Sequence, residues 1–253
     1  MLEKLKALDR WILFYLGVPR CVGCEEPLDT PFMPLCPTCL AKYDSVKTAN
    51  CSQCAKPLHK CSCVGEYLES HFIKKHFKVF RYENRDENLV ANEVIYSLKQ
   101  DNRADVCDFL ASEIAKTIED FVGERHDILF TNVPRRIKAV LDYGMDHAAE
   151  LAIRLARYFG CEYRSLLVSK TKKAQKTTHG AEREHNVVFD YKCKRPPDLT
   201  GRTVIIVDDV VTTGASVSTA GALLRALGAK TIIAASVAAT YKDKPSPLRK
   251  PQI

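Results

Sequence analysis

The chain lacks any long hydrophobic run. Its longest apolar stretch near the beginning covers residues 11–16, far short of the roughly 20 residues that cross a bilayer. Charged residues crowd this stretch and no small-residue cleavage site follows it, so the pattern does not match a secretory signal peptide. We therefore expect a cytoplasmic protein without a membrane span.

Two common catalytic signatures are also missing. The sequence has no Gly-x4-Gly-Lys-Ser/Thr motif, which excludes a P-loop nucleotide site, and no Cys-His or Ser-His-Asp nucleophile arrangement is evident. The formal net charge of +7 suits polyphosphate ligands or a nucleic-acid surface, but basic enzymes are common and the charge alone decides little. At 253 residues the chain is long enough for one or two domains with a buried core.

Cysteine is abundant, and most of it is clustered. Eight of the 11 cysteines form four close pairs: Cys21 and Cys24, Cys36 and Cys39, Cys51 and Cys54, and Cys61 and Cys63. Two residues between cysteines let one tight turn present two thiolates to the same zinc ion. In a reducing cytoplasm such clusters indicate metal, and disulfides are the alternative.

The simplest partition of these cysteines is sequential, with the first four on one ion and the last four on another. This arrangement predicts a double zinc ribbon that holds one or two structural Zn²⁺ ions. The last pair is one residue shorter than the others, and His59 is close enough to replace one of its ligands. Few apolar residues lie between the pairs, so we expect chelation to unfold this segment and leave the rest folded.

Residues 203–216 organise the remainder of the chain. Residues 203–207 are all β-branched, which predicts a strand buried on both faces at the centre of a parallel sheet. Asp208 and Asp209 follow the strand, and a helix with apolar residues at helical spacing comes next, ending near Gly228. The intervening loop contains Thr212, Thr213, Gly214, Ala215 and Ser216.

A strand, a loop of this composition and a helix amino terminus together make an anion site. Asp208 and Asp209 would repel a phosphate alone, so the ligand should also offer hydroxyls or a cation. A ribose 5-phosphate meets both demands, with its phosphate in the loop and its hydroxyls donating to the carboxylates.

The rest of the chain predicts an α/β fold with a parallel sheet flanked by helices. The expected strands cover residues 77–82, 128–133, 163–168, 187–189 and 231–237. The expected helices cover residues 3–16, 89–98, 104–122 and 146–159. We divide the chain into an N-terminal helix (1–18), a double zinc ribbon (19–66), an α/β domain (70–240) and a loose tail (241–253).

The central stretch resembles the motif that binds 5-phosphoribosyl-1-pyrophosphate (PRPP) in type I phosphoribosyltransferases. A cysteine ribbon followed by such a domain is similar to the ComF family, which is associated with natural competence. Three further blocks are similar to this family: residues 95–99, residues 133–156 and residues 175–187. Where the family usually has Arg-Gly-Phe-Asn-Gln, this chain has Tyr143-Gly144-Met145-Asp146-His147.

The resemblance implies PRPP bound with Mg²⁺ and a role for each charged segment. Asp208 and Asp209 would be catalytic and hold the ribose, and residues 212–216 would hold the 5-phosphate. Arg135 and Arg136 would form the pyrophosphate loop. The lysines of a flexible loop would close over the reacting centre: Lys170, Lys172, Lys173 and Lys176.

Two functions remain open on this basis. The chain is either a phosphoribosyltransferase that acts in DNA uptake on an unknown acceptor, or a non-catalytic PRPP-sensing protein that binds single-stranded DNA. A competence helicase or another DNA-processing protein is a further expected partner. The ribbon has few aromatic residues on which bases could stack, with Phe32 and Tyr43 the main candidates.

Overall fold

The computed structural model describes residues 12, 16–82, 89–123, 125–170 and 187–240. The predicted N-terminal helix and loose tail therefore lie almost entirely outside the described residues, as do Lys172, Lys173 and Lys176. Within the described residues no helix is long and apolar enough to cross a membrane.

A five-stranded sheet forms the centre of the fold, and all of its pairs are parallel. In spatial order its strands are β1 (His76–Arg81), β7 (Thr231–Ala239), β6 (Thr203–Val211), β2 (Ile128–Asn132) and β3 (Glu162–Tyr163). The predicted central strand is confirmed, because β6 is the middle strand and its residues from Val204 to Val207 are fully buried.

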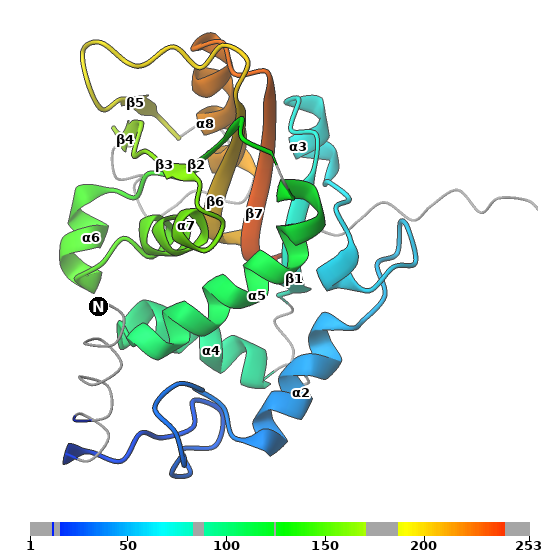
Figure 1. Cartoon of the computed structure of the whole chain (residues 1–253), viewed down its shortest axis with the longest axis vertical. Coiled ribbons are helices and arrows are strands. Elements are labelled where there is room, and N and C mark those ends of the chain that lie inside the picture. Colours follow the sequence, from blue (N-terminus) through cyan, green and yellow to red (C-terminus); the bar gives the residue numbers. More distant parts are fainter. Residues whose placement is uncertain (1–11, 13–15, 83–88, 124, 171–186, 241–253) are drawn as a thin grey trace, which may run out of the picture.

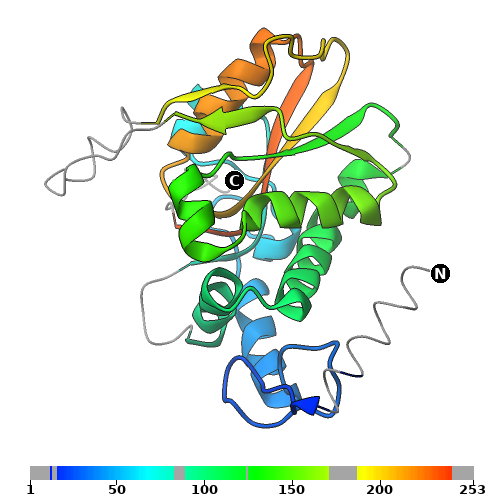
Figure 2. The same cartoon turned by 90° about the vertical axis from the view of Figure 1, so that its left-hand side faces the viewer.

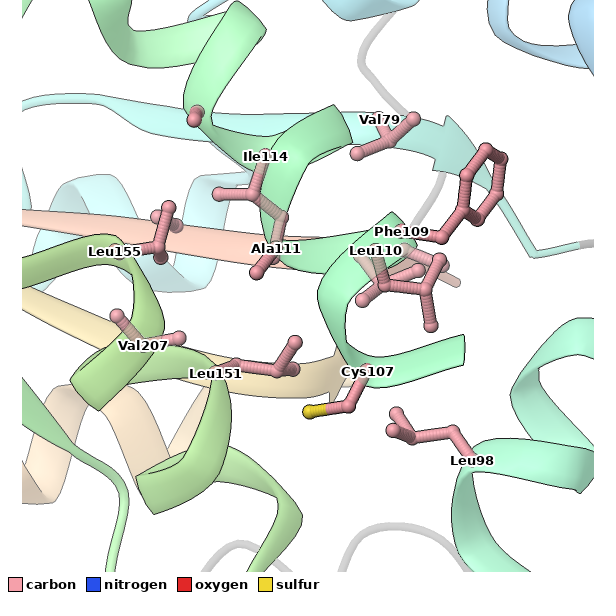
Figure 3. Packing of buried hydrophobic residues seen from close by; sticks show 14 of the residues in the cluster. Val79, Leu98, Cys107, Phe109, Leu110, Ala111, Ile114, Leu151, Leu155 and Val207 are labelled. Carbon is pink, nitrogen blue, oxygen red and sulfur yellow. The ribbon is translucent and has the colours of Figure 1, made fainter. Parts of the chain in front are cut away.

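Three helices cover one face of the sheet: α4 (Leu89–Gln100), α5 (Ala104–Val122) and α7 (His147–Tyr158). The long apolar stripe of α5 was predicted with its observed ends, and Ala111 and Ile114 of this stripe lie over the sheet (Figure 3). Leu151 and Leu155 of α7 pack beside them, so these helices fix the position of the segments between them.

The opposite face carries α8 (Ala215–Ala226), with α3 (Glu66–Ser70) against it. Val217, Ala220 and Leu224 of α8 pack on the β6 side chains of the same face. Figure 1 shows α8 behind β6 and β7, at the upper end of the molecule. This arrangement brings the amino terminus of α8 to the end of β6.

Several elements differ from the sequence prediction. The strand predicted at residues 163–168 is two short strands, β3 and β4 (Leu167–Ser169), and β4 pairs antiparallel with β5 (Phe189–Tyr191) in a separate ribbon. Three helices and a short 3-10 turn were not predicted: α2 (Pro37–Lys47), α3, α6 (Ile137–Tyr143) and η1 (Leu58–Lys60). The last three are too short for hydrophobic periodicity to be readable, and α2 buries only Cys39 and Tyr43 along its length.

The cysteine-rich segment shares its core with the sheet and helices. Tyr43 of α2 is fully buried, and its ring lies 5.2 Å from that of Phe109 on α5 and 5.6 Å from that of Phe80 on β1. Cys21 and Cys39 belong to the same apolar cluster. Figure 2 shows this segment below α4 and α5, at the end of the molecule away from α8.

Candidate functional site

The two acids lie near the carboxyl end of β6, which continues past them to Val211. Successive side chains of a strand point to opposite faces of the sheet, so Asp208 and Asp209 face in different directions. The sequence prediction placed both acids after the strand, whereas the structure includes both in β6, with Asp208 opposite Ser236 of β7. Their surroundings are therefore different.

Asp209 is buried and ion-paired with two cations. Its Oδ2 accepts a hydrogen bond from Arg135 at 2.9 Å, and Lys99 Nζ approaches the same oxygen to 3.3 Å. Burial raises the pKa of this carboxyl, but Lys99, Arg135 and the backbone N–H of Val210 together outweigh burial and leave its pKa below the ordinary value. Asp209 is thus held as a carboxylate.

Asp208 is half-buried, and its Oδ1 accepts the backbone N–H of Asp209 at 2.9 Å. Burial and the neighbouring charge of Asp209 raise the pKa of Asp208 well above its ordinary value. One strand end therefore carries two carboxyl groups whose pKa values are driven apart, an arrangement that is frequent at functional sites.

The loop after β6 leads directly into the helix. Gly214 precedes the first residue of α8 with φ of 91°, a left-handed conformation that favours glycine. A Cβ at this position would lie 2.7 Å from Leu68 of α3, so only glycine fits. Thr212 and Thr213 are exposed, and Oγ1 of Thr213 accepts a hydrogen bond from the backbone N–H of Ala215 at 3.3 Å. The first-turn N–H groups of a helix have no acceptor within the helix, which makes its amino terminus suited to an anion.

Arg135 reaches the acids from the loop that follows β2. Its Nη1 donates a hydrogen bond to Nδ1 of His147 at 2.7 Å, and its guanidinium lies 5.5 Å from the ring centroid of Tyr143. Arg136 lies at the start of α6. The structure therefore brings the first predicted arginine, but not the second, into contact with the acid pair.

Sequence reasoning missed three of the residues that surround this arginine: Lys99, Asn102 and His147. Asn102 Oδ1 bonds to Nε2 of His147 at 3.0 Å, and its amide donates to the carbonyl of Tyr143 at 2.6 Å. Lys99 and His147 both lie within blocks that resemble the family, and this resemblance was the available signal for them. Lys170 is exposed after β4, and its backbone N–H donates to Val188.

The first cysteine cluster fits a tetrahedral metal site. Cys21, Cys24, Cys36 and Cys39 hold their sulfurs within 4.8 Å of one another, and the Cys24 and Cys36 sulfurs are 3.7 Å apart. Four Zn–S bonds of about 2.3 Å place sulfurs about 3.8 Å apart. Burial raises the pKa of the Cys21 thiol. Hydrogen bonds from backbone N–H groups, led by that of Cys36, together have the larger and opposite effect, so the pKa falls below its ordinary value to about 7.

The second cluster contains the other four thiols: Cys51, Cys54, Cys61 and Cys63. Their sulfurs also lie within 4.8 Å of one another, so the short spacing of the last pair does not prevent a four-thiol site. His59 instead turns its Nδ1 to the carbonyl of Lys47 at 3.0 Å. Both clusters could therefore bind zinc.

The second cluster rests on the edge strand β1. Lys78 is fully buried, and its Nζ donates to the carbonyl of Cys63 at 3.0 Å and approaches the Cys61 sulfur to 3.8 Å. The backbone N–H of His76 donates to Ser62 at 3.2 Å. A buried ammonium at this position offsets the negative charge of thiolates on a divalent ion.

Residues 99–253 match the family model for the phosphoribosyl transferase domain, which is more than half of the chain. The chain belongs to this family. Four of the five strands of the parallel sheet, β2, β3, β6 and β7, lie within the matched residues, with the acid pair near the end of β6. The cysteine clusters precede the matched residues.

Two solved structures are similar to part of this chain. A purine phosphoribosyltransferase from Pyrococcus horikoshii is 17% identical with a TM-score of 0.35, covering 58% of this chain and 91% of its own. The protein TT1426 from Thermus thermophilus is 16% identical with a TM-score of 0.32, covering 58% and 86%. No curated protein matches the sequence.

Proposed function

We propose that the phosphoribosyltransferase domain binds PRPP with Mg²⁺ and transfers its phosphoribosyl group to an acceptor. The observation that carries the proposal is the convergence of Arg135 and Lys99 on Asp209, beside a loop that opens on the amino terminus of α8. The helix terminus suits the 5-phosphate, the carboxylates suit the ribose hydroxyls, and the cations suit the pyrophosphate.

Each group has a distinct task in this proposal. The loop residues 212–216 hold the 5-phosphate, and Asp208 and Asp209 accept from the ribose hydroxyls. Arg135 balances the charge that develops as pyrophosphate leaves the anomeric carbon. Bound Mg²⁺ supplies further neutralisation of that leaving group. The proposal also includes Arg136 at the pyrophosphate loop and a closing loop that contains Lys170, Lys172, Lys173 and Lys176.

We also propose that residues 19–66 form a double zinc ribbon attached to the phosphoribosyltransferase domain of residues 70–240. The two four-thiol clusters support this assignment. The order of ribbon and domain supports placement in the ComF family, with a role in DNA uptake and contact with a competence helicase or another DNA-processing protein. These three points are tested in turn by elemental analysis, by complementation of a transformation-deficient strain and by capture of the helicase.

The decisive test of the ligand site is calorimetric titration with magnesium–PRPP. Asp208→Asn combined with Asp209→Asn keeps size but removes both carboxyl groups, including the charge of Asp209. Loss of charge-assisted hydrogen bonds, each worth about 1.5–3 kcal/mol, should weaken binding at least about tenfold. A plain anion site would instead bind more tightly once the negative charge of Asp209 is gone, so the sign of the change discriminates.

The matched control is Glu119→Gln combined with Asp120→Asn, which removes two adjacent acids from the exposed carboxyl end of α5. This variant should bind PRPP as the unaltered chain does. Pyrophosphate release across a panel of bases and amines then identifies the acceptor. Unchanged PRPP affinity in the Asp208 and Asp209 variant would refute the assigned site.

A second candidate function, binding of single-stranded DNA, is favoured by a basic cleft of about 980 Å³. The cleft lies between the second cysteine cluster, the start of β1 and the end of α5, and Phe77 and Phe121 contribute its aromatic surface. Its lining includes one carboxylate, from Asp120, and five cationic side chains: Lys56, Lys60, Lys75, Lys116 and Arg125. The cleft borders the amino end of β1, whereas the acids lie near the carboxyl end of the parallel strand β6, so both ligands could bind at the same time.

Fluorescence anisotropy with a labelled single strand tests this function. Phosphate contacts release counterions, so affinity should fall steeply with salt and vary little with sequence. Lys60→Glu with Lys75→Glu should abolish binding, and the same change at Lys138 and Lys192, which do not line the cleft, is the control. Binding that survives high salt, or equal losses in both variants, would contradict this function.

A further inference from the structure

His147 is the first residue of α7 and is fully buried, and both of its ring nitrogens have polar partners. Nδ1 lies 2.7 Å from Nη1 of Arg135, and Nε2 lies 3.0 Å from Oδ1 of Asn102. A guanidinium can only donate, so Nδ1 must be the acceptor and the ring proton must be on Nε2. The imidazole is therefore neutral, in a single tautomer.

The partners of His147 are consistent with this protonation state. Asn102 donates its amide to the carbonyl of Tyr143, which leaves its Oδ1 to accept from Nε2 of the ring. Burial and the adjacent Arg135 lower the pKa of His147 to about 4. Lys99 lowers this pKa as well, while Asp209 and Glu150 act in the opposite direction.

We infer that His147 is a positioning residue that holds Arg135 in the orientation needed to bind the pyrophosphate of PRPP. His147 fixes Nη1 and Asp209 fixes Nη2, so two contacts on different nitrogens define the plane of the guanidinium. These two bonds use two of its five N–H donors, and the others remain to meet a ligand. The inference rests on the proposed function.

A neutral acceptor is the appropriate group at this position. A cation at residue 147 would repel Arg135 and Lys99, and a carboxylate would compete with the ligand for the guanidinium. Glutamine offers the same pair of functions as this histidine tautomer, an acceptor on one side and a donor on the other. Glutamine is therefore the conservative replacement, and leucine is the apolar replacement of similar size.

The experiment compares magnesium–PRPP affinity in the unaltered chain, His147→Gln and His147→Leu by calorimetry at pH 7.5. His147→Leu should bind about tenfold more weakly, while His147→Gln should stay within about threefold of the unaltered chain. A merely structural role would not separate these two variants by their affinity. Equal affinity in all three proteins, or equal losses in both variants, would overturn the inference.

Asn102→Gly provides a second test should His147→Leu fail to fold. Asn102 has φ of 50°, which glycine tolerates, and the change removes the acceptor for Nε2 together with the amide that donates to Tyr143. We expect a loss of about threefold in PRPP affinity, and full affinity would count against the inference.

A ligand-free measurement separates this inference from the proposed function. Long-range ¹H–¹⁵N spectra should show His147 as the Nε2–H tautomer at pH 7, and an Nδ1–H tautomer or an imidazolium would overturn the inference. If the unaltered chain fails to bind PRPP, the proposed function falls and the inference falls with it. If it binds PRPP and His147→Leu binds equally well, only the inference falls.

Discussion

Replacing each acid of β6 singly should produce opposite effects on stability, although the two residues are adjacent and identical. Asp209→Asn removes the charge that Arg135 and Lys99 share. Hydrogen bonds to charged groups contribute about 1.5–3 kcal/mol. Because both cations are partly exposed, with side-chain exposures of 21% and 30%, we expect a loss near the lower end of this range.

Asp208→Asn should stabilise the protein, and more so as pH rises. The native pKa of Asp208 lies above its unfolded value, so the unaltered protein loses stability as pH climbs from the unfolded to the native pKa. The amide does not titrate, and the difference between variant and unaltered protein should grow by at most about 1.4 kcal/mol per pH unit. Above the native pKa this difference should level off.

The pH dependence of Asp209→Asn should be flat by comparison. The native pKa of Asp209 lies below its ordinary value, so its stabilisation is complete above an unfolded pKa of about 3.9 and is lost only in stronger acid. The window from about pH 5.5 to 8 avoids proton-driven release of metal from the thiolates. Across this window the loss of the Asp209 ion pairs should therefore be constant, and any change with pH reports Asp208, whose pKa Asp209 raises.

Chemical denaturation of the zinc-loaded proteins at several pH values measures both effects. The difference in unfolding free energy between variant and unaltered chain reports the replaced acid together with its effect on the neighbouring groups, of which the other acid is the nearest. The double variant should not be additive, because each acid alters the pKa of the other. Two single variants with equal losses at every pH would refute the different environments assigned to these carboxyl groups.

Two further predictions concern the cysteine-rich segment. Elemental analysis should find about two zinc ions per chain. Lys78→Met should lower zinc affinity about tenfold or more at the second cluster alone, and Cys51→Ser, which removes a ligand, identifies that cluster. Equal weakening of both clusters would contradict the role of Lys78. Tyr43→Ala should lower the free energy of unfolding by about 3–5 kcal/mol, measured by thermal denaturation. Tyr43→Phe should be neutral or stabilising, because the hydroxyl is buried without a hydrogen-bond partner among the described residues. A large loss of stability with phenylalanine would contradict this reasoning.

The sequence predicted elements whose pattern is long and local. The 19 residues of α5 show an apolar stripe that periodicity reveals, and the β-branched run of β6 indicates burial on both faces. The cysteine pairs indicate their partners because zinc ligation depends on spacing and sulfur chemistry. In each case the evidence lies within a short stretch of chain.

The arrangement around Arg135 could not be read in this way. Arg135 and Asp209 are 74 residues apart, and their contact depends on the parallel pairing of β2 with β6 and on the turn between β2 and α6. His147 was noted only as the last residue of a segment that departs from the family pattern, and its role arises from being buried beside a cation. Side-chain contacts between separate elements follow from packing, which spacing does not encode.

The shared core also changes what metal removal is expected to do. Gly23, between two ligands of the first cluster, is so close to Cys39 and to Val90 of α4 that a Cβ there would lie 2.9 Å from the Cys39 sulfur and 3.2 Å from Val90. The same helix carries Lys99, about 14 Å further along its axis at 1.5 Å per residue, where it pairs with Asp209. The first cluster thus packs against one end of α4, and Asp209 forms an ion pair with Lys99 at the other end. Chelation should therefore weaken magnesium–PRPP binding at the proposed site as well as unfold the ribbon, in contrast to the sequence expectation that the rest of the chain stays folded.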